Sequence, residues 1–153
     1  MRLFYLNSIS FLLCCCIAMS CKTNQTNSVP EAEVIFSLKT TSCMGECPVF
    51  EMELYGDKTL VFNGKQHTEV SGEQQKTLTD EQFEALLGII ESADWPGLDD
   101  EYKSTMLDLP TQNFKYNRNG IQKSVIKYGT APKSINNMSD IILTFVEEQV
   151  FNE

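Results

Sequence analysis

The sequence predicts an α+β domain, built as an antiparallel sheet of about five or six strands with two helices packed on one face. Three observations lead to this prediction. Several short segments alternate apolar and polar residues, which indicates half-buried strands. Two longer segments carry apolar residues at helical spacing, and an Asn-Gly pair marks a tight hairpin turn. The order along the chain is β-ββ-(β)-α-ββ-α, in which the bracketed strand has the least pattern.

The first strands lie on both sides of a pair of cysteines. Residues 33–38 alternate moderately and predict one strand. Residues 49–55 alternate clearly, with three apolar side chains on one face and two glutamates on the other. A turn over 55–58 then leads into the partner strand, 59–62. One more short strand is expected around 68–70, inside a polar stretch.

The first helix has a clear beginning and end. Thr79 is a good N-cap and Gln82 follows three residues later, as in a capping box. Leu78 and Phe83 occupy the positions of a hydrophobic staple, and the apolar stripe continues from Phe83 at helical spacing. Trp95-Pro96-Gly97 ends the helical region.

The second half repeats the order hairpin then helix. Residues 113–117 and 123–128 form a hairpin around Asn119-Gly120, and the last helix runs roughly over 134–150. An aromatic residue and a valine have the same spacing from the turn glycine in both hairpins. Duplication of a ββα unit explains this likeness, and so does the general similarity of any two hairpins that precede helices.

These elements form a single domain, which we place at 34–151. The charge composition of the whole chain limits its possible partners. Lys and Arg number 12 against 21 Asp and Glu, so the net charge is −9. A nucleic-acid-binding surface needs clustered positive charge to displace counterions, and we therefore expect no nucleic acid partner.

The amino terminus is typical of an export signal. Residues 1–20 contain one Arg and then a short apolar run, which is too short to span a membrane. Ala18-Met19-Ser20-Cys21 resembles the lipobox of bacterial lipoproteins. We therefore expect cleavage before Cys21, acylation of its thiol, and a membrane anchor. Residues 21–33 are mostly polar and read as the lipidated Cys and a flexible tether.

The lipobox also predicts a location, the bacterial cell envelope. We expect the outer membrane. In some bacterial lipoproteins an acidic cluster after the acylated Cys directs export to the cell surface, and no such cluster follows Cys21. The periplasmic face is therefore favoured over the cell surface.

After cleavage, and with Cys21 acylated, Cys43 and Cys47 are the two cysteines that remain, and three interpretations of them stay open. A disulfide would staple a short connection between strands, with Gly45 taking a positive φ angle and Pro48 directing the exit. A redox pair would need a nearby cation, whereas Glu46 lies between them. A zinc site would need His67, the single His, as a third ligand.

The sequence contains no catalytic signature from which a reaction could be predicted. It has no G-x-S-x-G motif and no glycine-rich phosphate loop. We expect no catalytic residue, no cofactor and no bound metal, and we favour an interaction or ligand-binding module whose partner is an envelope protein or a small ligand. The alternative is a thiol-redox or metal-assisted enzyme using Cys43 and Cys47. Tyr55, Tyr116 and Tyr128 would either contact a partner from the exposed side of the hairpins or pack as cross-strand pairs.

Two motifs carry a resemblance to a known family. Residues 43–50 read CMGECPVF, and 108–111 read DLPT after the acidic-Tyr segment 100–102. They resemble an uncharacterised, domain-of-unknown-function family of bacterial envelope lipoproteins, with the pattern Cys-aromatic-Gly-x-Cys-Pro-x-aromatic and a later Asp-x-Pro-Thr. Met44 stands where that family has an aromatic residue. The resemblance covers roughly residues 34–148 and implies a compartment and a fold, but no reaction.

Overall fold

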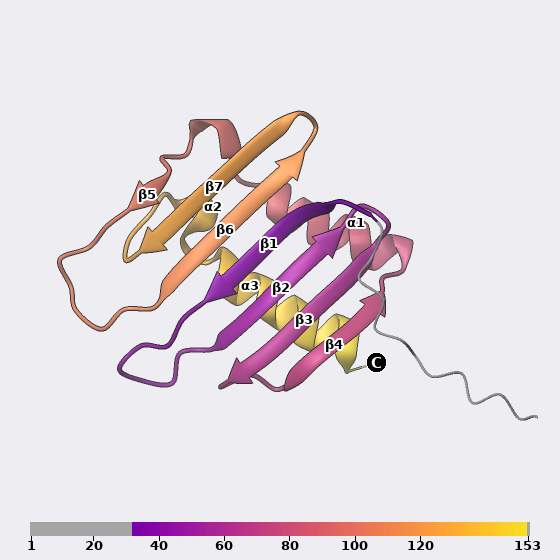
Figure 1. The fold of residues 1–153 in the computed structure, drawn as a ribbon, viewed down its shortest axis with the longest axis horizontal. Coiled ribbons are helices and arrows are strands. Elements are labelled where there is room, and N and C mark those ends of the chain that lie inside the picture. The colour runs from indigo at the N-terminus through magenta and orange to yellow at the C-terminus, as the bar shows by residue number, and fades with distance from the viewer. Residues whose placement is uncertain (1–31, 153) are drawn as a thin grey trace, which may run out of the picture.

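A computed structural model describes residues 32–152, and they form one seven-stranded sheet (Figure 1). The expected signal peptide at 1–20, the anchor Cys21 and nearly all of the tether lie outside the described residues. The strands are β1 (Val34–Thr40), β2 (Val49–Tyr55), β3 (Thr59–Gln66), β4 (Gly72–Thr77), β5 (Glu101–Tyr102), β6 (Thr111–Arg118) and β7 (Ile121–Tyr128). Their order across the sheet is β4-β3-β2-β1-β6-β7-β5.

Strand β1 lies at the centre and joins the two halves of the chain. It pairs antiparallel with β2 on one side and with β6 on the other. The hairpin β2-β3 therefore extends the sheet in one direction and the hairpin β6-β7 extends it in the other. Asn119 and Gly120 have φ angles of 54° and 76°, so the Asn-Gly turn takes the backbone conformation that its sequence predicts.

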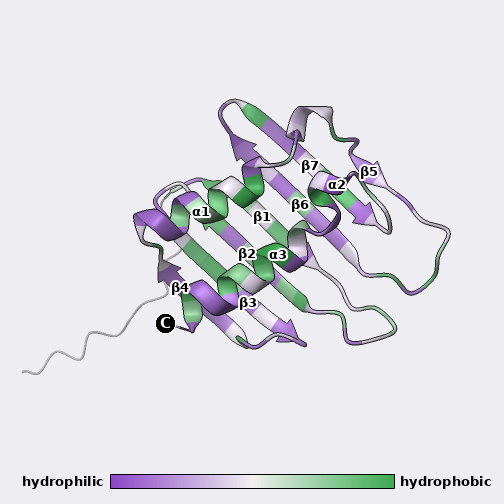
Figure 2. Ribbon diagram, turned by 180° about the vertical axis from the view of Figure 1, so that it is seen from behind, coloured by the Kyte–Doolittle hydropathy of each residue, from purple (hydrophilic) through white to green (hydrophobic). Residues whose placement is uncertain are grey.

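The helices lie together on one side of the sheet, as Figure 2 shows, and the strands are uncovered in the opposite view of Figure 1. The helical elements are α1 (Asp80–Glu91), the short 3-10 turn η1 (Trp95–Gly97), α2 (Lys133–Asn136), α3 (Met138–Phe145) and the π turn η2 (Val146–Phe151). Apolar side chains of both helical regions join those of β1, β2, β3 and β6 in one core. The prediction of an α+β fold is thus confirmed.

The predicted strand count was too low. The structure has seven strands, because β5 adds a two-residue parallel pairing with β7 in a region with no alternation. The optional strand exists as β4, but it covers 72–77 and not 68–70. Every β4 residue is polar or glycine, so periodicity could not locate it, and it is defined by its pairing with β3.

The beginning of α1 follows its sequence closely. The Thr79 hydroxyl accepts from the Gln82 amide N–H, and the Gln82 side chain accepts from the Thr79 N–H. Leu78 and Phe83 are buried as a staple pair. The predicted capping box is therefore confirmed.

The last helix is broken where a single element was expected. Asn137 separates α2 from α3, and α3 passes into the π turn η2. In η2 the buried Glu147 carboxylate accepts from the backbone N–H groups of Glu69 and Val70, at 2.6 and 3.3 Å. This contact ties the β3–β4 connection to the carboxyl-terminal element, and local helical spacing gives no sign of it.

The tryptophan after α1 organises the core over β1 and β6. Trp95 is 2% exposed, and its indole N–H donates to the Ile90 carbonyl at 2.9 Å. Its ring stacks on Tyr116 with centroids 5.0 Å apart and meets Phe36 edge-on at 6.0 Å. Tyr116 therefore lies in the core and not on an exposed side, which corrects one of the two expectations for the tyrosines.

Replacing the cap of α1 tests how much this helix start contributes. Thr79 is exposed, so Thr79→Ala should remove the cap without leaving a cavity. We expect the free energy of unfolding to fall by about 1 kcal/mol, measured by urea denaturation. Thr79→Ser keeps the hydroxyl and should retain most of the stability. Equal losses in both variants would contradict a capping role.

Candidate functional site

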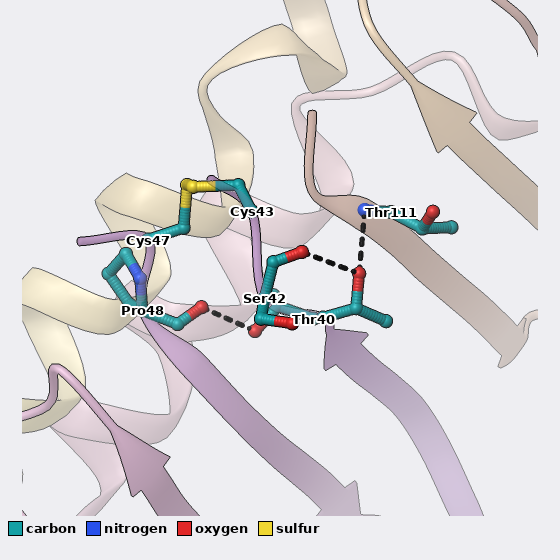
Figure 3. Close-up of a disulfide and its surroundings, with 7 residues drawn as sticks. Thr40, Ser42, Cys43, Cys47, Pro48 and Thr111 are labelled. Carbon is teal, nitrogen blue, oxygen red and sulfur yellow. Dashed lines mark hydrogen bonds between the residues drawn. A yellow bond between two sulfur atoms is a disulfide. The ribbon is translucent and has the colours of Figure 1, made fainter. Parts of the chain in front are cut away.

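The connection from β1 to β2 is closed by a disulfide between Cys43 and Cys47, whose Cα atoms are 5.7 Å apart (Figure 3). Pro48 follows at once, and its carbonyl accepts from the Thr40 hydroxyl at 2.8 Å. Gly45 does not take the positive φ angle expected for it. A Cβ there would meet Cys43 Sγ at 3.8 Å, which is ordinary contact. The loop therefore closes without needing glycine at this position.

The two sequence motifs meet at the same end of the sheet. The Thr41 N–H donates to the Thr111 carbonyl at 3.0 Å, and the Thr111 N–H donates to the Thr41 hydroxyl at 2.9 Å. Within the disulfide loop, the Met44 N–H donates to the Asp108 carbonyl at 3.3 Å. The cysteine loop and the DLPT segment are thus joined by backbone contacts, although they are far apart in the sequence.

A row of polar side chains crosses the covered face of the sheet beside this loop. Thr40 lies opposite Gln112 in the β1–β6 pairing, and Gln112 lies opposite Lys127 in the β6–β7 pairing. The three side chains are 4%, 7% and 8% exposed. The neighbouring positions on this face along the three strands are mostly apolar, so the row interrupts the core surface.

A directed chain of hydrogen bonds runs through the row to the helix above it. The Lys127 ammonium donates to Gln112 Oε1 at 3.0 Å, and Gln112 Nε2 donates to Ser139 Oγ at 2.5 Å. The Ser139 hydroxyl then donates to Asp140 Oδ1 at 3.4 Å. Ser139 is buried and Asp140 is exposed, so the chain leads from a buried cation to a carboxylate at the surface.

A pocket of about 260 Å³ opens onto this row. Its walls include Cys47 and Pro48 from the disulfide loop and Pro110 from the DLPT segment. Its lining also includes Lys127 and Asn136, which supply an ammonium and an amide. Both motifs that carry the family resemblance therefore contribute to the wall of one polar pocket.

Burial changes the titration of the lysine in this pocket. Removal from water lowers the pKa of Lys127, and the negative charge of Asp140 acts in the opposite direction. Among the described residues, the ammonium makes one side-chain hydrogen bond, to Gln112. The site thus holds a cation with little of the hydrogen bonding that it would have in water.

The uncovered face of the sheet carries a second, wider concavity of about 630 Å³. Glu51 lies in it between Lys39 and Lys65, at 2.6 and 2.7 Å, and these ammonium groups lower the pKa of Glu51. Beside it, burial and then the Glu53 carboxylate raise the pKa of Tyr55 to about 12. These charges are largely paired within the sheet, which is usual for the solvent side of an antiparallel sheet.

The metal interpretation finds no geometric support in the part of the chain that the structure describes. The two sulfurs are bonded to each other, and His67 is exposed at the end of β3. Within residues 32–152, no three His, Cys, Asp or Glu side chains come together in a way that could hold a metal ion.

Sequence reasoning missed the residues that form the pocket's polar row. Gln112 and Lys127 each occupy an inward position of an alternating strand, and a polar residue at such a position is the signal that could have found them. Ser124-Val125-Ile126-Lys127 also matches the S-x-x-K pattern of some serine enzymes. In strand β7 this spacing places Ser124 and Lys127 on opposite faces, so they do not act together.

Removing the disulfide tests its structural role. Replacing both Cys43 and Cys47 by Ser should lower the free energy of unfolding by about 2 kcal/mol, because the bridge restricts the unfolded chain. Chemical denaturation measures this, and mass spectrometry after alkylation counts free thiols in the wild type. Ser42→Ala, an exposed change in the same loop, should leave stability within about 0.5 kcal/mol of wild type. A double variant as stable as wild type would argue against the staple.

Comparison with known proteins gives a family but no activity. No curated protein matches the chain. The family model described as a domain of unknown function (DUF6438) matches residues 34–146, which span the sheet, both motifs and most of the last helical region. The chain therefore belongs to the DUF6438 family of domains of unknown function.

Proposed function

We propose that this protein is a non-catalytic ligand-binding module of the bacterial cell envelope, tethered to a membrane by lipid on Cys21. The observation that carries the binding role is the pocket beside the Cys43–Cys47 loop, because a buried polar row lines it within an otherwise apolar face. Burying Lys and Gln side chains costs stability unless they are well satisfied. Because the row costs stability, a role in binding a ligand explains it better than a role in folding does.

The anchor and the location are supported by the sequence. The apolar run, the Ala18-Met19-Ser20-Cys21 site and the polar residues after it are the features that indicate lipidation. We place the protein at the outer membrane, facing the periplasm. Of the helices in residues 32–152, none has the length and apolar character needed to cross a membrane.

An envelope protein is the second candidate partner, and the exposed apolar residues support it. Met44 is 84% exposed, and Met106 and Leu107 are 64% and 82% exposed. They belong to the cysteine loop and to the segment before the DLPT motif, which are held together by the Met44–Asp108 backbone contact. Exposed methionines are adaptable contact residues at protein-binding surfaces.

Thiol-redox or metal-assisted chemistry at Cys43 and Cys47 is the competing proposal. A reactive thiolate is favoured by a nearby cation. Lys39, which lies four residues before Cys43 in the sequence, is paired with Glu51. Glu46 lies inside the loop and would disfavour a thiolate. These observations favour the structural role of the pair.

The anchor is tested by Cys21→Ser. We expect this variant to move from the membrane to the soluble fraction and to lose incorporation of labelled palmitate, because the acylated thiol is absent. Cys16→Ser, inside the expected signal, is the matched control and should behave as wild type. Unchanged fractionation and labelling of Cys21→Ser would refute lipidation at this residue.

The binding role is tested with three small probes of different charge, namely acetate, acetamide and methylammonium. We expect at least one to cause saturable NMR shifts of the Gln112 side-chain amide and of Ser139, measured in the full chain in detergent micelles. Asn136→Trp should weaken this response by filling the pocket, whose lining includes Asn136. If none of the three probes gives a saturable response, the pocket does not bind small ligands.

A further inference from the structure

We infer that the ligand of this pocket is a small monocarboxylate whose oxygens bind the Lys127 ammonium, an inference that rests on the ligand-binding role proposed above. Lys127 lines the pocket and is 8% exposed. It lies on the covered side of the sheet, above which α3 packs. A ligand in the pocket therefore meets a cation that is itself largely shielded from bulk water, and an ion pair is stronger there than at the surface.

The ammonium has hydrogen-bonding capacity left for such a ligand. An ammonium carries three N–H donors, and among residues 32–152 the Lys127 ammonium donates one side-chain hydrogen bond, to Gln112 Oε1 at 3.0 Å. Gln112 is a neutral acceptor, and its own amide is already used on Ser139. A buried cation satisfied by one neutral group is a costly arrangement. An anionic oxygen from the pocket would relieve that cost.

The size and charge of the pocket favour a carboxylate over a phosphate. Its volume of about 260 Å³ lies just below the usual range for drug-sized ligands and therefore suits a small molecule. Phosphate groups are commonly held by an Arg fork or by several donors together, whereas Lys127 is the one cationic side chain in this lining. A planar carboxylate can place one oxygen on that ammonium and the other toward the Asn136 amide, which lines the same pocket.

Asp140 disfavours a ligand that carries two negative charges. It also lines the pocket, and it is exposed near the end of the hydrogen-bond chain through Ser139. Its carboxylate would repel an anionic ligand and at the same time favour the charged form of Lys127. With Lys127 and Asp140 both in its lining, the pocket should bind a ligand with one negative charge more readily than a ligand with two. Removal of the Asp140 carboxylate should strengthen carboxylate binding.

Acetate titration of the full chain in detergent micelles tests this inference, with sodium chloride at matched ionic strength as the reference. We expect saturable shifts of the Gln112 side-chain amide with acetate and none with chloride. Lys127→Met should weaken acetate binding at least about tenfold, because a charged hydrogen bond is lost. At a pH at which Lys127 stays protonated, Asp140→Asn should tighten it about twofold to fivefold, because the repulsion between the two carboxylates is removed.

Lys123→Met is the matched control, because Lys123 lies on the same side of β7 but pairs with Asp100 outside the pocket. It should bind acetate as wild type does. If Lys127→Met does not fold, acetate binding by Asp140→Asn, a change at an exposed residue, becomes the deciding measurement. Acetate binding by this variant that is unchanged or weaker than in the wild type overturns the inference. Equal responses to acetate and chloride overturn it as well. Saturable binding of acetamide or methylammonium without acetate would overturn it while leaving the ligand-binding role intact.

Discussion

The antiparallel pairing of β1 with β6 is the contact on which the rest of the molecule depends. It joins a strand at the start of the domain to one that comes after α1, and it places the two hairpins on opposite sides of one central strand. It also brings the cysteine loop against the DLPT segment. Because side chains alternate between faces, a shift of one residue in this register would turn Gln112 to the open side and bury Asn113.

Much of the fold follows from local patterns. The alternation of 49–55, the Asn119-Gly120 turn and the capping box at Thr79 each specify their structure within a few residues. The elements that escaped prediction depend on contacts that are distant in sequence. Strand β4 is polar throughout and is held by β3, and β5 consists of two residues beside β7. No periodicity exists in either segment for a sequence argument to detect.

The candidate site also has one part that follows from local sequence and another part that depends on contacts distant in the sequence. The disulfide could be anticipated because Cys43 and Cys47 are neighbours in the chain. The inward positions of Gln112 and Lys127 could be suspected from the alternation of their strands. Their meeting with Thr40 could not be predicted, because it depends on two separate strand pairings. The row's hydrogen bond to Ser139 needs α3 as well, and α3 begins only after a break at Asn137 that helical spacing does not reveal. The combination of these residues is therefore a product of the topology.

The composition of β4 has a consequence for how this molecule meets copies of itself. An edge strand offers free backbone donors and acceptors to any other extended chain, and long apolar edges promote aggregation. At one end of this sheet the edge strand reads GEQQKT, with both charge signs and no apolar side chain. At the other end β5 pairs with two residues, Ile126 and Lys127, of the eight-residue strand β7. The β4 margin of the sheet is therefore a poor template for intermolecular β-pairing, which limits edge-to-edge association of this domain.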